Sequence, residues 1–229
     1  MIVKYCDSKH NARHAKTIQI GTLEYYRKHA NEFIKDPDEG IENRIVKPRP
    51  GLTTTGPDLG NNHQGPIIFG FNSASITPLT FPNTYIFCCS IVDHEAQIDP
   101  STFGYNSFYV IKDYKEFAKQ VGNTLLDLQK KKKSLSDVVT VHPFISEVKY
   151  LDDKTETYED LHPRINNIDI DFLFRKNKYS KTKKKDFSVE RELRFAWLLI
   201  DKNKNAVDVE KDPIQIQNSK LIRKCLEFR

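Results

Sequence analysis

An alternation of polar and apolar residues between positions 185 and 199 predicts a β-strand that carries charged groups. Successive side chains of a strand point to opposite faces, so Glu190, Glu192 and Arg194 share one face. The other face carries Arg191 followed by apolar side chains, namely Leu193, Phe195, Trp197 and Leu199. Ionised groups on a strand that enters the interior are costly unless they are paired or functional. This strand is therefore the first candidate for a chemical role.

Similar patterns, rich in β-branched and aromatic residues, predict strands along most of the chain. They are expected at residues 2–6, 17–20, 41–46, 67–71, 84–90, 106–112, 138–141, 144–151, 214–216 and 221–228. A stretch rich in Pro, Gly, Asn and Asp covers residues 35–65 around one of these strands. A loop of this length in a compact domain is usually functional or mobile, and we expect it to be mobile without ligand.

Helical spacing is strongest in the middle of the chain. Asp113 has the layout of a helix N-cap, with Glu116 three residues later and an apolar stripe that continues to Gly122. Further helical segments are expected at residues 124–132 and 165–174, with short helical turns at 11–15 and after the strand at 17–20. Because strands mostly follow strands, the order favours an α+β fold over a doubly wound parallel sheet.

The length and composition fit one soluble globular domain spanning residues 1–229. The chain has 229 residues, of which 38% are hydrophobic, and its formal net charge is +5. There is no apolar run of the roughly 18–20 residues that a membrane span needs, and the first residues lack a signal-peptide layout. We therefore expect a cytoplasmic protein without a membrane partner.

Cysteine and histidine spacing does not predict a metal site. The four cysteines lack a Cys-x-x-Cys pair and are expected to be reduced and buried; they are Cys6, Cys88, Cys89 and Cys225. Among seven histidines only His10 and His14 have a helical i, i+4 spacing, and no third ligand accompanies them. Motifs of dinucleotide-binding folds, P-loops, zincin proteases and α/β-hydrolases are also absent from the sequence.

Two lysine-rich runs, at residues 130–133 and 181–185, leave two interpretations open. They can contact the phosphates of a nucleic acid. They can equally be a solvated helix end and a loop.

Three segments, taken in chain order, resemble the ADP-ribosyltransferase superfamily. They are Val3–Tyr5 on the first strand, Phe87–Ser90 at the end of a middle strand, and the late Glu190-x-Glu192 strand. The order Lys4-Tyr5, Asp36-Pro37-Asp38-Glu39 and Glu190-Arg-Glu-Leu-Arg194 also resembles a bacterial relative of that superfamily. The chain departs from the pattern at its first strand, which has Lys4 and Tyr5 where the superfamily has Arg or His. It also has Phe103-Gly104-Tyr105 in place of a Trp-x-x-Tyr segment.

The resemblance implies a single domain with a split, mixed but mostly antiparallel sheet, and NAD as the substrate. Glu192 would stabilise the oxocarbenium-like ribose that forms when nicotinamide leaves. Glu190 would orient the acceptor or take its proton. Ser90 would support Glu192 through a hydrogen bond.

The resemblance also assigns NAD-binding residues. Tyr5 or Tyr105 would stack on nicotinamide, and Lys4 and Ser90 would belong to the same binding site. The implied enzyme is a bacterial or phage toxin or defence effector with a macromolecular acceptor, for which nucleic acid is one candidate, and with an antitoxin as a further candidate partner.

Two other interpretations of the sequence remain. In the first, the protein is a non-catalytic module that binds nucleic acid or protein, and the acids of the 185–199 strand are structural and pair with Arg194 and other basic groups. In the second, it is a metal-dependent nuclease, for which Asp169 and Asp171 near Lys176 and Lys178 offer a loose match.

Overall fold

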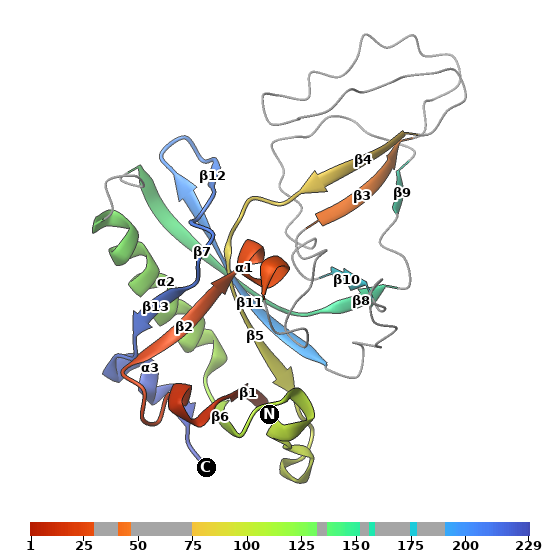
Figure 1. The fold of residues 1–229 in the computed structure, drawn as a ribbon. Coiled ribbons are helices and arrows are strands. Elements are labelled where there is room, and N and C mark those ends of the chain that lie inside the picture. Colours follow the sequence, from red (N-terminus) through yellow and green to blue (C-terminus); the bar gives the residue numbers. More distant parts are fainter. Residues whose placement is uncertain (30–40, 47–74, 132–136, 152–155, 159–174, 178–190) are drawn as a thin grey trace, which may run out of the picture.

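The fold is α+β, built on a curled and mostly antiparallel sheet with few helices (Figure 1). The computed structural model describes residues 1–29, 41–46, 75–131, 137–151, 156–158, 175–177 and 191–229. The expected strand at 67–71, the helix at 165–174, most of the 35–65 loop and the lysine run at 181–185 lie outside these residues. No described helix has the length and apolar character needed to cross a membrane.

Nine strands form the main sheet. They are β1 (Ile2–Cys6), β2 (Thr17–Thr22), β5 (Tyr85–Ile91), β6 (Ser107–Ile111), β7 (Val138–Glu147), β11 (Glu192–Asp201), β12 (Ala206–Val207), β13 (Ile214–Gln217) and β14 (Leu226–Glu227). Two small sheets are formed by β3 (Ile41–Val46), β4 (Ser75–Thr80) and β9 (Glu156–Tyr158), and by β8 (Lys149–Leu151) and β10 (Arg175–Asn177). The helices are α1 (Leu23–Lys28), α2 (Tyr114–Lys131) and α3 (Lys220–Lys224), with 3₁₀ turns at Ser8–His10, Glu95–Gln97 and Pro100–Phe103.

The centre of the main sheet is the antiparallel trio β7, β11 and β5. On its far edge β5 pairs with two different strands, β1 near its C-terminal end and β2 near its N-terminal end. The sheet continues from β1 through β6 to β14, and from β2 to β13. It therefore divides into two branches at β5.

Helix α2 covers one face of the sheet and forms the main core with it (Figure 1). Its buried Phe117 packs against Phe195 with ring centroids 5.5 Å apart, and the Trp197 indole donates a hydrogen bond to the Ala118 carbonyl at 2.8 Å. Gly122 lies against the same indole, because a Cβ added there would be 3.3 Å from Trp197 Cδ1. The apolar alternation from Leu193 to Leu199 is thus the helix-covered face of β11.

Three expected elements differ from the structure. The two helices expected at 113–122 and 124–132 are one helix, α2, because Gly122 serves a close helix–strand contact and does not end the helix. The strands expected at 138–141 and 144–151 are continuous through His142-Pro143 as β7, which ends at Glu147, and residues 149–151 form the separate strand β8. Among the described strands β7 pairs with β11 alone, so the missing N–H of Pro143 is tolerated at a sheet edge. The strand expected at 221–228 begins instead as helix α3, whose N-cap Ser219 accepts a hydrogen bond from Ile222 N, and only Leu226–Glu227 form a strand, β14.

The cysteines are free thiols, and three of the four are buried as expected. Burial raises the pKa of Cys6 to about 11 and also raises the pKa of Cys89. Cys88 differs because it is only half-buried.

The contact between Gly122 and Trp197 predicts a position-specific effect of side-chain volume. Gly122→Val should lower the free energy of unfolding by about 1–3 kcal/mol, because added methyl groups overpack the indole. Asn123→Val places the same side chain at an exposed neighbouring position of α2 and should cost less than about 1 kcal/mol. Urea unfolding of both variants measures the difference. Equal costs at the two positions would show that Gly122 is not in close contact with Trp197.

Candidate functional site

The two branches of the sheet diverge at the middle of β5. Ile2 and Val3 of β1 pair with Ile91 and Ser90, whereas Gly21 and Thr22 of β2 pair with Ile86 and Tyr85. Between these contacts, no described strand pairs with residues 87–89 on this edge. We call this divergence of β1 and β2 from residues 87–89 the fork.

Lys4 extends into the fork. Its ammonium group donates a hydrogen bond to the Cys88 carbonyl at 2.8 Å, and it lies 4.6 Å from the centroid of the Phe87 ring. A cation near an aromatic face is stabilised by the ring quadrupole, which helps to offset the cost of removing Lys4 from water. The side chain thus links β1 to β5 beyond the last residues that pair.

Ser90 brings the first strand and the late acidic strand together. It pairs with Val3 on one side and with Glu192 on the other, so the three residues form a row across β1, β5 and β11. Directly opposed residues of an antiparallel pair present their side chains on the same face. Among the described residues the Ser90 hydroxyl forms no hydrogen bond, so its position beside Glu192 rests on strand register.

Glu192 forms a buried ion pair with Arg194 on the face of β11 opposite α2. Both guanidinium nitrogens Nε and Nη2 contact Glu192 Oε1, at 3.0 and 2.9 Å. The Arg194 side chain is 0% exposed and that of Glu192 is 7% exposed. A buried ion pair with this geometry holds both groups in a fixed orientation, and loss of either partner removes charge compensation from the other.

Strand β11 begins at Glu192, later than the alternation had suggested. Arg191 has φ +39°, a left-handed value that is uncommon for a residue other than glycine, and its exposed side chain forms an ion pair with Asp93 at 2.5 Å. The expectation that Arg191 would share the apolar face is therefore wrong, because its backbone leaves the strand geometry. Glu190, the expected companion of Glu192, lies outside the described residues.

Tyr26 is a site residue that the sequence analysis missed. Its ring lies over Gly21, where an added Cβ would be 2.4 Å from Tyr26 Cε2. Burial, followed by the nearby Cys88 and Glu192, raises the pKa of Tyr26 well above its ordinary value, so the phenol keeps its proton. The signal in the sequence was the glycine, since glycine within a strand often marks a close approach of another group.

The two expected aromatic residues of the site differ in their surroundings. Tyr5 is buried, with its ring centroid 5.1 Å from that of Phe103, and it belongs to a small core with Val3. Tyr105 is half-buried; burial raises its pKa, and the positive charge of Lys4 opposes that rise. Both tyrosines thus pack at the small core that contains Val3, and Tyr105 also lies near the positive charge of Lys4.

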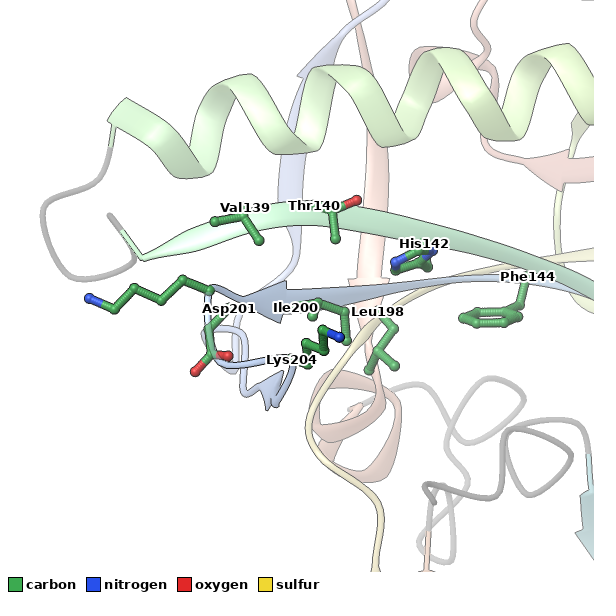
Figure 2. Close-up of a pocket in the computed structure, with 9 residues that line it drawn as sticks. Val139, Thr140, His142, Phe144, Leu198, Ile200, Asp201 and Lys204 are labelled. Atoms are coloured by element: carbon green, nitrogen blue, oxygen red, sulfur yellow. The ribbon is translucent and has the colours of Figure 1, made fainter. Parts of the chain in front are cut away.

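A hollow of about 630 Å³ lies elsewhere, near the turn that follows β11. Figure 2 shows His142 and Phe144 of β7 and Leu198 of β11 beside it, with Lys204 reaching in from the turn. Leu198 is six residues along β11 from Glu192, about 20 Å at the usual strand rise. None of the residues singled out from the sequence for chemistry lines this hollow.

The described residues contain no group of three or more His, Cys, Asp or Glu side chains that could hold a metal ion. The carboxylates considered for a nuclease, Asp169 and Asp171, lie outside those residues. The candidate site in the described part of the chain is the fork and the adjoining row of Val3, Ser90 and Glu192, which together bring one carboxylate, one hydroxyl, one ammonium group and phenols to this part of the sheet.

Comparisons of the chain with protein-family models, with curated proteins and with solved structures find no match.

The close approach of Gly21 and Tyr26 predicts strong coupling between the two positions. Gly21→Ala should destabilise the protein by about 1–3 kcal/mol, because the new methyl group overlaps the Tyr26 ring. In a Tyr26→Ala background the same substitution should cost much less, giving a coupling energy above about 1 kcal/mol in a double-mutant cycle measured by urea unfolding. Additive effects would show that the Tyr26 ring does not lie over Gly21.

Proposed function

We propose that the protein is an ADP-ribosyltransferase that uses NAD as its substrate and Glu192 as its catalytic carboxylate. The observation that carries the proposal is the register that joins the three motif-bearing strands. Val3, which precedes Lys4 in the chain, lies in one row with Ser90 and Glu192 across β1, β5 and β11. The three residues are far apart in sequence. The resemblance requires the three segments to lie together in the fold, whereas their positions in the sequence do not by themselves require this.

The chemistry of the row suits cleavage of the bond between nicotinamide and ribose. When this bond breaks, its electron pair leaves with nicotinamide, and positive charge develops on the ribose. A carboxylate fixed in a water-poor setting stabilises such charge strongly, because it does not reorient during the reaction. The Arg194 guanidinium keeps Glu192 in one orientation.

The groups around Glu192 suit the rest of the substrate. Lys4 supplies a positive charge at the fork, where its ammonium binds the Cys88 carbonyl, and this charge favours an anionic molecule such as NAD. Tyr105 offers an aromatic ring for nicotinamide, and Tyr26 offers a protonated phenol near Glu192. Glu190 would take the proton of the acceptor nucleophile as that nucleophile attacks the ribose carbon.

We assign the enzyme to bacterial or phage toxins or defence effectors that act in the cytoplasm on a macromolecular acceptor. One observation favours the alternative, a binding module without catalysis. Glu192 and Arg194 are buried and paired with each other, as expected of a structural ion pair. Catalysis requires the Glu192 carboxylate itself, whereas a structural role requires only that the ion pair be intact.

A comparison of Glu192→Gln with Arg194→Gln separates catalysis from stability. Both substitutions break the same ion pair and should destabilise the protein, by up to about 3–5 kcal/mol. Glu192→Gln should also lower NAD consumption by about 100-fold or more, because the charge that stabilises the ribose cation is lost. Arg194→Gln keeps the carboxylate and should retain measurable turnover.

The assay measures release of nicotinamide and addition of ADP-ribose mass in a cell lysate, at a temperature where circular dichroism shows both variants folded. Equal losses in the two folded variants would contradict a catalytic role for Glu192. Absence of NAD turnover by the wild-type protein would favour the binding module.

A further inference from the structure

Two segments far apart in sequence form one basic surface. The first is the connection between β1 and β2, residues 9–16, and the second is residues 218–224, which contain α3. Asn218 joins them, because its side-chain amide donates hydrogen bonds to the carbonyls of Ala12 and Ala15 at 2.7 and 3.3 Å. In Figure 1 the turn after β1 lies beside α3 at the same end of the molecule. We call residues 9–16 and 218–224 the basic surface.

The basic surface is rich in exposed positive charge. Its exposed cations are Lys9, Arg13, Lys16, Lys220, Arg223 and Lys224, and it contains no carboxylate. Asp7 and Glu227 flank the two segments along the chain, and Asp113 and Glu116 of α2 lie near Cys225 at the end of α3, so the six cations outnumber the neighbouring carboxylates. Within the described part of the chain none of these six cations forms a salt bridge. They are therefore available to an anionic partner.

Arg223 is already held in place on this surface. Its Nη2 donates a hydrogen bond to the Arg13 carbonyl at 3.1 Å, and its guanidinium carbon lies 5.7 Å from the centroid of the Phe228 ring. The Arg13 backbone N–H is in turn bonded to Asn11 Oδ1 at 2.8 Å. Ordering these groups before binding reduces the entropy lost when a partner binds.

We propose that the basic surface binds the phosphate backbone of a nucleic acid duplex, independently of base sequence. Contacts from Lys and Arg to phosphates account for most sequence-independent binding. Single-stranded nucleic acid is usually held by aromatic side chains on which bases stack, and the two segments contain no Phe, Tyr or Trp. A membrane surface would need an apolar face, and Leu221, 54% exposed, is the one exposed large hydrophobic side chain among the described residues of this surface.

This surface is separate from the fork and does not depend on the proposed transferase activity. Residues 9–16 nevertheless connect β1 with β2, the two strands that frame the fork. A duplex bound to the basic surface would therefore lie at the end of the fork where residues 9–16 join β1 to β2. The basic surface is also distinct from the two lysine runs at residues 130–133 and 181–185.

Charge-removal variants test the proposal with a fluorescein-labelled duplex DNA of mixed sequence and no NAD present. Arg13→Ala/Lys16→Ala/Lys220→Ala/Lys224→Ala should weaken binding by roughly tenfold or more at low salt. It should also reduce the slope of log affinity against log salt by about 0.9 for each lost phosphate contact. The matched control, Lys119→Ala/Lys202→Ala/Lys204→Ala/Lys211→Ala, removes the same number of exposed lysine or arginine charges outside the basic surface and outside both lysine runs, and should change affinity by less than about threefold.

Four outcomes would overturn the proposal. They are failure of the wild-type protein to bind the duplex at low salt, equal weakening in the two variants, tighter binding of a single strand of the same sequence, and binding to phosphatidylserine vesicles in preference to the duplex. The Glu192→Gln variant should bind the duplex as the wild-type protein does. Loss of NAD turnover and loss of duplex binding can therefore be told apart.

Discussion

The candidate site depends on how β1 and β2 pair with the edge of β5 that faces away from β11. β1 pairs with one end of this edge and β2 with the other, so hydrogen bonding between strands is interrupted at residues 87–89. The ammonium of Lys4 occupies that interruption and bonds to the Cys88 carbonyl. A carbonyl removed from water without a partner is costly, and Lys4 supplies the hydrogen bond that the carbonyl of the half-buried Cys88 does not receive from β1 or β2. Because Lys4 follows Val3 on β1, its side chain leaves the strand on the face opposite to that of Ser90 and Glu192 and reaches the fork from there.

The two faces of β11 divide stability and chemistry between them. The face that carries Phe195 and Trp197 packs against α2 and forms the larger core. The opposite face begins with the buried ion pair of Glu192 and Arg194 and becomes apolar only at Ala196 and Leu198. A buried ion pair is weak support for stability but strong support for a fixed geometry. This difference explains why charged residues are placed on a strand whose remaining residues are suited to the interior.

The sequence predicted local features well and non-local ones poorly. Alternation identified the two faces of β11 from Glu192 onward, and the Asp113 cap located the start of α2, because both patterns depend on near neighbours. Gly122 and Pro143 were misinterpreted as breaks, since their tolerance depends on Trp197 and on an edge position in the sheet. The fork depends on pairings between segments as far apart as β1 and β5, which no local pattern contains. Tyr26 became a site residue only through its contact with Gly21.

The central claim is that NAD binds at the fork with its nicotinamide ribose against Glu192. A crystal structure of the protein with a non-hydrolysable NAD analogue tests it most directly. We predict that the nicotinamide ribose contacts the Glu192 carboxylate, with the nicotinamide ring near Tyr105 and the phosphates on the side of Lys4. Binding of the analogue in the hollow between β7 and the turn after β11, or at any place that leaves the row of Val3, Ser90 and Glu192 untouched, would contradict the account.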